Sequence, residues 1–343
     1  MEDNNILIKG NNISGLKWLL DNGYKGKIDL VYIDPPFATG GTFSKDKNGR
    51  VATISKSSDS ILAYSDTLQG KDYINYLKER VLLIRELLSD KGSFYLHIDY
   101  KIGHYVKVML DEVFGIDNFR NDITRIKCNP KNFERIGYGN IKDMILFYTK
   151  GKRPIWHNPT FPCTKEEIER LYTKIDSNGR RYTTVPIHAP GETKNGESNK
   201  PFRGIYPPKG RHWRCSVEEL EELDRQGLIE WSSKGNPRKI NYADDHMTKK
   251  AQDIWEFKDP SYPIYPTEKN LDLLKFIIEA SSDEDSIVMD CFCGSGTTMV
   301  AASICNRRWI GIDKSEVAIE TVKNRFNTDN SLFKEKPYRY LEI

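Results

Sequence analysis

The sequence lacks several features that mark well-known protein classes. No apolar run in its 343 residues approaches the ~18 residues that a membrane-spanning helix needs. The N-terminus, Met1-Glu2-Asp3-Asn4-Asn5, is acidic rather than signal-like. The sequence contains no internal repeat and no low-complexity tract. Together with a hydrophobic fraction of 38% and a charged fraction of 29%, these absences predict a soluble, cytoplasmic protein.

Paired cysteines are also missing. The six cysteines, at positions 128, 163, 215, 291, 293 and 305, form no CxxC pair, so neither a disulfide framework nor a zinc or other metal site is expected. Cys291 and Cys293 alternate at the end of an apolar strand, where small buried thiols are the expected state.

Segments of α/β character occupy both ends of the chain. Short apolar runs predict strands at 28–33, 93–98, 144–148, 287–291 and 309–312. Helical spacing predicts helices at 71–90, 104–114, 271–280, 297–305 and 315–326. This alternation predicts a mostly parallel sheet with helices on both faces. The apolar stripe of 71–90 could form a dimer seam, but packing on the sheet is the commoner explanation.

The middle of the chain has a different character. Residues 152 to about 265 are rich in Pro, Gly, Lys, Arg and aromatics, with one acidic helix near 217–226. This segment is expected to be an insertion. Just before it, residues 120–153 contain nine lysines and arginines against three acids. A nucleic-acid surface would have this charge, and so would a solvated face without a partner.

A glycine turn lies between a predicted strand and helix near the C-terminus, in Asp290-Cys291-Phe292-Cys293-Gly294-Ser295-Gly296-Thr297-Thr298. Glycines allow a tight turn, and a helix N-terminus offers free N–H donors. Asp313, at the end of the next strand, can accept both hydroxyls of a ribose. Met299 replaces the third glycine of the dinucleotide fingerprint, which argues against a nicotinamide oxidoreductase. A carboxylate at Asp290 suits the cationic methionine end of S-adenosylmethionine better than a pyrophosphate.

A second motif, Asp34-Pro35-Pro36-Phe37, follows the apolar strand 28–33. Asp34 and the Pro35 carbonyl can accept hydrogen bonds from an exocyclic amino group and offset the positive charge that develops when it attacks a methyl sulfonium. Phe37 can stack on a base that has left the double helix. A strand-terminating turn with Phe37 in the core is the structural alternative.

Together these motifs resemble the β-class amino-DNA methyltransferases of bacterial restriction-modification systems, in which the catalytic motif precedes the recognition domain and the cofactor motif comes last. Residues 7–12 with 33–40 look most like type III modification subunits and their solitary relatives. Further matching segments are 105–115, 143–150, 210–213, 227–231 and 265–269. Where several members carry an acidic residue after the first strand, this chain has Asn11 or Asn12.

The resemblance implies an α/β, Rossmann-like, S-adenosylmethionine-dependent methyltransferase fold, circularly permuted, with an inserted target-recognition domain. The expected division is a catalytic half at 1–150, a target-recognition domain at 151–260 and a cofactor-binding half at 261–343. The expected catalytic residues are Asp34, Pro35, Pro36 and Phe37. The expected cofactor-binding residues are Asp290, Phe292, Cys293, Gly294, Ser295, Gly296, Thr297, Thr298 and Asp313, and the resemblance adds Thr267 and Lys269 for the methionine carboxylate.

The favoured activity is methylation of adenine N6 in a short sequence of double-stranded DNA, because an Asp rather than the Ser usual in cytosine-N4 relatives precedes Pro-Pro. Cytosine-N4 methylation, an RNA or protein amide substrate and a DNA-reading subunit without activity are the alternatives. A homodimer and a cognate restriction endonuclease are conceivable partners. Residues expected to contact DNA, against the alternative of solvated loops, are Lys131, Arg135, Arg203, Lys209, Arg211, Trp213 and Arg214.

Overall fold

The structure is a computed structural model that describes residues 5–36, 42–45, 51–52, 61–65, 70–130, 132, 134, 136–191, 196–261, 263, 268–327 and 337–343. It divides into two compact units. Unit 1 comprises Met1–Pro159 with Gln252–Ile343, and unit 2 comprises Thr160–Ala251. The sequence placed the corresponding boundaries at 150 and 260. In the described parts of the chain, no helix combines the length and apolarity that crossing a bilayer requires.

Unit 1 is built on a nine-stranded sheet in the order β17-β7-β8-β6-β2-β18-β19-β1-β20. β8 runs antiparallel to β6 and β7, and the other neighbours in this sheet run parallel. The strands are β1 (Asn5–Lys9), β2 (Ile28–Ile33), β6 (Leu88–Ile98), β7 (Phe119–Ile126), β8 (Lys142–Thr149), β17 (Ile254–Glu256), β18 (Ile287–Asp290), β19 (Arg308–Asp313) and β20 (Tyr338–Glu342).

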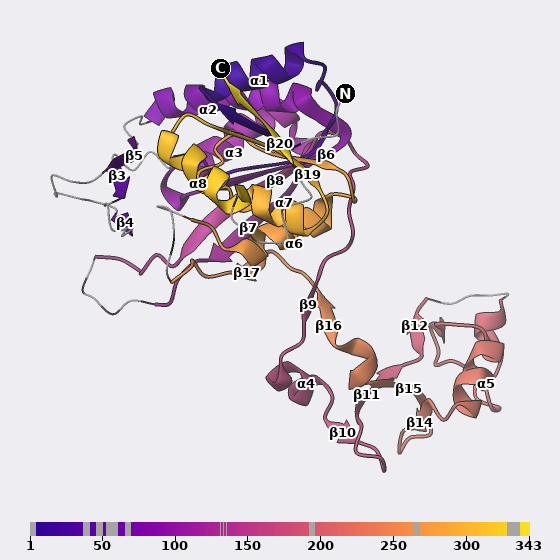
Figure 1. Cartoon of the computed structure of the whole chain (residues 1–343). Helices are drawn as coiled ribbons and strands as arrows, with labels where there is room; N and C mark the ends of the chain where they lie inside the picture. Colours follow the sequence, from indigo (N-terminus) through magenta and orange to yellow (C-terminus); the bar gives the residue numbers. More distant parts are fainter. Residues whose placement is uncertain are drawn as a thin grey trace. The chain divides into compact units, whose positions relative to one another are not determined.

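The helices of unit 1 form two groups on opposite faces of this sheet, as Figure 1 shows. The first group contains α1 (Asn12–Asp21), α2 (Gly70–Leu87) and α3 (Tyr100–Phe114), and the second contains α6 (Leu271–Ser281), α7 (Thr297–Ile304) and α8 (Glu316–Asn327). A small sheet joins β3 (Thr42–Lys45), β4 (Val51–Ala52) and β5 (Ile61–Ser65), and a 3-10 turn covers Ile116–Asn118. The expected Rossmann-like α/β fold with helices on both faces is confirmed.

The two ends of the chain share one sheet. β2 pairs with β18, placing Val31 beside Met289, and β1 lies between β19 and β20. This pairing confirms the circularly permuted order, in which the cofactor motif follows the catalytic motif. The first strand, the first helix and the last strand have no counterpart among the elements predicted from periodicity.

Unit 2 contains short elements, in keeping with its weak periodicity. A four-stranded sheet joins β10 (Lys174–Ile175), β11 (Arg181–Pro186), β15 (Pro237–Tyr242) and β14 (Ile229–Trp231). Two strand pairs, β12 (His188–Pro190) with β13 (Arg211–Trp213) and β16 (Thr248–Lys250) with β9 (Thr160–Pro162), accompany it. The helices are α4 (Lys165–Leu171) and the expected acidic α5 (Val217–Arg225), with 3-10 turns at Glu197–Asn199 and Ala243–His246. The buried core consists of Ile187, Phe202, Trp213, Leu220 and Ile229.

The apolar stripe of α2 packs inside its own chain. Leu77, Val81 and Ile84 are fully buried and belong to the same core cluster as the strands of the large sheet. The stripe therefore gives no support to a dimer seam, and the commoner explanation, a helix on a sheet, is correct.

Shortening one residue of this stripe should destabilise unit 1. Leu77→Ala should lower the free energy of unfolding by about 3 kcal/mol, because it removes a buried side chain and leaves a cavity. The matched control is Leu82→Ala on the same helix, where the side chain is 47% exposed. Urea unfolding of both variants tests this, and equal losses would contradict the packing described.

Candidate functional site

Three aspartates meet at the carboxyl ends of three adjacent strands. Asp34 directly follows β2, Asp290 ends β18 and Asp313 ends β19. These strands are parallel neighbours, with Asp290 beside Gly311 in register. In such sheets ligands bind in the crevice at this edge. The fold therefore brings the two motifs of the sequence to one place.

The glycine turn between β18 and α7 has a conformation that only glycine accepts readily. Gly296 has φ of 79°, and a Cβ on it would lie 2.8 Å from the Val322 side chain. Its N–H donates to the Cys293 carbonyl. Gly296 is also the N-cap of α7 and supplies no side-chain cap, which leaves helix N–H groups suited to an anionic ligand group. Cys291 and Cys293 are buried, as expected.

Asp290 is a buried carboxyl with an unusual pKa. It accepts hydrogen bonds from Phe292 N at 2.9 Å and Thr298 Oγ1 at 2.7 Å. Desolvation nevertheless raises its pKa from 3.8 to about 7, and the charges of Asp34 and Asp313 add to the effect. A cation placed beside this carboxyl would offset the cost of ionising it.

Asp313 holds the glycine turn in place. Gly294 N donates to its Oδ2 and Ser315 N to its Oδ1, both at 2.9 Å. Burial raises its pKa in spite of these two donors. A carboxylate has about four lone-pair sites, so each oxygen can still accept one further donor.

Asp34 forms an ion pair that the sequence did not predict. Its Oδ2 lies 2.5 Å from Nζ of Lys269, and both side chains are largely buried, at 15% and 9% exposure. Its Oδ1 is buried and accepts no hydrogen bond from the described part of the chain. One oxygen is thus held by a cation while the other is available as an acceptor.

The residue beside Lys269 links the same segment to the glycine turn. Glu268 pairs with Arg325 of α8, and Arg325 Nη1 lies 3.4 Å from Thr297 Oγ1. Thr297 in turn contacts Ser295 Oγ at 3.0 Å. The segment just before α6 therefore touches both the Asp34 side and the glycine-turn side of the site.

Four residues expected at the sites lie outside the described residues: Phe37, Thr267, Lys131 and Arg135. Of the remaining catalytic residues, Pro35 is buried and Pro36 half-buried beside Asp34. Among the described residues, no group of three His, Cys, Asp or Glu side chains is arranged to hold a metal ion.

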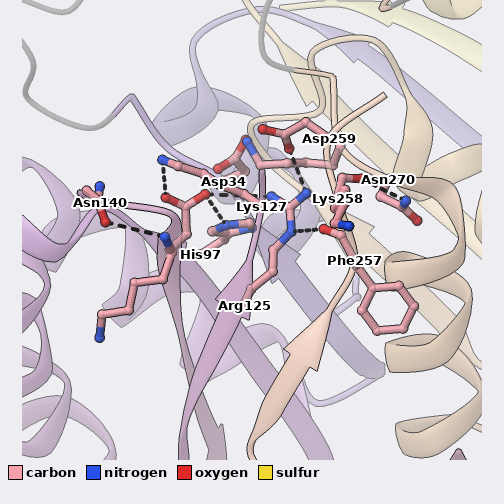
Figure 2. A network of polar contacts seen from close by, with 12 residues as sticks. Asp34, His97, Arg125, Lys127, Asn140, Phe257, Lys258, Asp259 and Asn270 are labelled. Carbon is pink, nitrogen blue, oxygen red and sulfur yellow. Dashed lines mark hydrogen bonds and ion pairs between the residues drawn. The ribbon is translucent and has the colours of Figure 1, made fainter. Parts of the chain in front are cut away.

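A buried polar network lies behind Asp34 and escaped the sequence analysis (Figure 2). Tyr32 Oη lies 2.8 Å from His97 Nδ1, and His97 Nε2 lies 3.2 Å from Asp143 Oδ2. Asp143 Oδ1 also accepts from Lys127 Nζ at 2.6 Å. Burial lowers the pKa of His97, which favours the uncharged ring. Burial would raise the pKa of Asp143, but the contacts with His97 and Lys127 hold it well below the usual value.

Arg125 extends this network to the segment that follows β17. Its guanidinium is fully buried. Nε donates to the Phe257 carbonyl at 2.7 Å and Nη2 to Asp259 Oδ1 at 2.6 Å, while Nη1 lies 3.6 Å from Asp143 Oδ2. Two cations of the basic run 120–153, Arg125 and Lys127, therefore bind partners inside the protein.

A second unforeseen cluster lies beside Phe292. Arg80, 5% exposed, donates from Nε to Asn12 Oδ1 at 2.7 Å and stacks 3.4 Å above the centre of the Tyr76 ring. The Tyr76 ring lies 6.4 Å from that of Phe292. Asn11 caps α1 by accepting from Ile13 N. Asn12 is thus the partner of a buried arginine.

In unit 2 the residues that were expected to contact DNA differ in their exposure to solvent. Arg203, Lys209, Arg211 and Arg214 are exposed, with Arg203 paired to Asp224. Trp213 is 1% exposed and donates to the Lys200 carbonyl from within the core of unit 2. The expectation that Trp213 contacts DNA is therefore wrong, because its ring is the largest apolar group available to that small core.

Arg211, Arg214 and Arg238 lie near His188. Its pKa is lowered by burial first and then by the charges of Arg211, Arg214 and Arg238. Arg211 Nη1 lies 3.1 Å from His188 Nδ1. Arg238, which the sequence did not single out, donates to Thr184 of the neighbouring strand. Strand pairing thus concentrates positive charge from separate segments.

Known proteins resemble this chain along most of its length. The sequence model of a family described as DNA methylase matches residues 28–324. The chain is 40% identical over 328 residues to the type II methyltransferase M.EcaI of Enterobacter cloacae, covering 94% of this chain and 69% of that protein. It is 26% identical to the type III restriction-modification enzyme EcoPI Mod subunit of Escherichia phage P1, covering 99% of this chain but only 62% of that subunit.

Solved structures share the fold. The putative DNA modification methylase TTHA0409 of Thermus thermophilus, complexed with S-adenosyl-L-methionine, superposes with a TM-score of 0.50 at 14% identity. The match covers 98% of each chain.

The raised pKa of Asp290 predicts a pH-dependent stability. Because the folded state favours the protonated carboxyl, the stabilising contribution is present below pH 4 and is lost as the pH rises through about 7. The loss is on the order of 4 kcal/mol. Urea unfolding between pH 4 and 8 should show Asp290→Asn gaining stability relative to the unmodified protein as the pH rises. A difference that stays constant with pH would contradict this.

Proposed function

Since this chain belongs to the DNA methylase family, in its β class of amino-group methyltransferases, we propose that it transfers a methyl group from S-adenosylmethionine to adenine N6 in a short sequence of double-stranded DNA. The observation that carries the proposal is the state of Asp34. One carboxylate oxygen is held by Lys269 and the other is buried without a partner in the described residues. An acceptor in this state is prepared for a donor N–H from a substrate.

Asp34 would accept a hydrogen bond from the amino group that attacks. The nitrogen lone pair of adenine N6 is delocalised into the ring, and an anionic acceptor on its N–H favours the tetrahedral nitrogen that attack requires. As the bond from nitrogen to the methyl carbon would form, the bond from carbon to sulfur would break and its electron pair would stay on sulfur, which leaves the thioether S-adenosylhomocysteine. One N6 proton would pass through its hydrogen bond to Asp34 and on to solvent. Lys269 keeps Asp34 oriented throughout. Pro35, which has no N–H of its own, offers its carbonyl as a second acceptor.

The residues around the glycine turn fit S-adenosylmethionine, which supplies an activated methyl group on a cationic sulfur. Asp290 is costly to ionise while buried, and a cationic ligand would relieve that cost. Asp313 retains lone pairs for ribose hydroxyls, and the N-terminus of α7 lacks a side-chain cap. We therefore assign cofactor binding to Asp290, Asp313, Lys269 and the turn from Phe292 to Thr298.

Adenine is preferred to cytosine because the catalytic loop begins with Asp rather than Ser. Cytosine-N4 methylation is the second candidate, since the same family serves both bases. Double-stranded DNA fits the arginine cluster of unit 2, for which we propose target recognition. A cognate endonuclease, a homodimer and a cytoplasmic location remain predictions. The assays below would also reveal the alternatives, which are an RNA substrate, a protein substrate and a DNA-reading subunit without activity.

Methylation assays test the activity and its base. Purified protein with labelled S-adenosylmethionine and DNA should yield N6-methyladenine, and Asp34→Asn should lower the rate at least about 100-fold, because it removes the anionic acceptor. Asp272→Asn, on an exposed residue of α6, is the matched control and should keep the rate. N4-methylcytosine as the sole product would defeat the adenine assignment. Expression in a methylation-free host, followed by modified-base sequencing, would identify the recognition sequence.

Arg211 tests the proposed DNA surface of unit 2. Arg211→Ala should weaken DNA binding and reduce the slope of log K against log salt by about 1, because one phosphate contact is lost. The control is Arg225→Ala on α5, where the arginine is exposed and paired with Glu222 within its own helix. Fluorescence anisotropy at several salt concentrations measures both variants, and equal binding would remove Arg211 from the surface.

A further inference from the structure

We propose that Arg125 and Asp259 form a clamp that positions Lys269 against Asp34, so that two residues outside the reacting centre control the rate of methyl transfer. The proposal rests on the proposed function of Asp34. Both are positioning residues, because they act on Lys269 through residues 257–259 and the neighbouring Asn270.

The clamp fixes the segment that follows β17. β17 pairs with β7 in parallel, and Asp259 N donates to the Lys127 carbonyl at 2.8 Å. Arg125 holds two points of the same segment at once, the Phe257 carbonyl and the Asp259 carboxylate. One guanidinium therefore determines where residues 257–259 lie on the edge of the sheet.

The fixed segment is in turn bonded to the residue beside Lys269. The side-chain amide of Asn270 donates to the Lys258 carbonyl at 2.9 Å (Figure 2). Asn270 is also the N-cap of α6, where its Oδ1 accepts from Leu273 N. Lys269 is therefore placed by the start of α6 on one side and by the Arg125-bound segment on the other.

The same network reaches Asp34 from the opposite direction. Asp143 contacts Arg125, Lys127 and His97, and His97 contacts Tyr32, two residues before Asp34 on β2. The contacts thus form a closed ring that begins and ends at the Asp34–Lys269 ion pair. Contacts across β2, β6, β8 and β7 therefore connect Asp34 and Lys269 to the same four strands.

Energetics also favour a positioning role over a stabilising one. A fully buried guanidinium loses its hydration, and replacing buried ion pairs by apolar side chains often stabilises a protein. Nη1 of Arg125 has no hydrogen-bond partner in the described structure. An apolar residue at this position would avoid the desolvation free energy of the guanidinium, but it could not bind the Phe257 carbonyl and Asp259 together.

The test compares Asp259→Ala with Glu256→Ala. Asp259 is half-exposed, so its variant should fold, and Glu256 is an exposed residue of the same segment, paired only with Lys258 among the contacts described. In single-turnover methylation, Asp259→Ala should lower the rate about 10- to 100-fold, because small misplacements at a reacting centre are costly. Its affinity for DNA should change less than about threefold, and any loss of affinity for S-adenosylmethionine through Lys269 should be smaller than the loss of rate. Asp259→Glu should recover most of the rate.

Hydrogen exchange provides a readout that does not need activity. In Asp259→Ala, amides of 254–261 should exchange faster than in Glu256→Ala, while the rest of unit 1 keeps its protection. Rates equal to those of the control, a weakened cofactor affinity that accounts for the whole loss, or protection lost throughout unit 1 would each overturn the clamp. An unmodified protein without methylation activity would instead refute the proposed function, and the exchange comparison would still decide whether the clamp exists.

Discussion

The parallel pairing of β2 with β18 is the constraint on which the site depends. These strands come from opposite ends of the sequence. Asp34 directly follows β2 and Asp290 ends β18, at the same edge of the sheet. If the register slipped by one residue, every side chain would move to the other face. Asp34 would then no longer lie beside Lys269 or next to Asp290. The order of motifs along the chain matters less than this single register.

Bringing carboxylates together at one edge has an electrostatic cost that the protein meets in three ways. Asp34 has a lysine as counter-ion. Asp313 receives two backbone N–H donors. Asp290 has two neutral donors and no cationic partner among the described residues, and its pKa rises to about 7. The carboxyl with the weakest compensation is therefore the one for which a cationic ligand group offers the largest gain.

Local patterns were sufficient for the elements that carry the site and insufficient for the contacts inside it. β2, α3 with its end at Gly115, and the turn before α7 follow from apolar runs, capping and glycine. The Lys269–Asp34 pair and the Arg125 ring depend on packing between distant segments, which no local pattern encodes. Trp213 was misassigned for the same reason, since Leu220 and Ile229, from other elements, decide that its ring is buried.

The buried charges of unit 1 oppose stability, and their distribution explains how the fold accommodates them. Arg125, His97 and Asp143 lie within the large sheet, between strands whose apolar faces are covered by helices on both sides. Burial favours the uncharged form of His97, which has one hydrogen-bond partner on each ring nitrogen. The charges that the network has to balance are then those of Asp143 and its two cations. A buried network of this kind is stiff, because moving one member would leave the others without partners in a medium of low dielectric constant. That stiffness is the property an acceptor such as Asp34 needs, since its orientation has to be set before a substrate arrives.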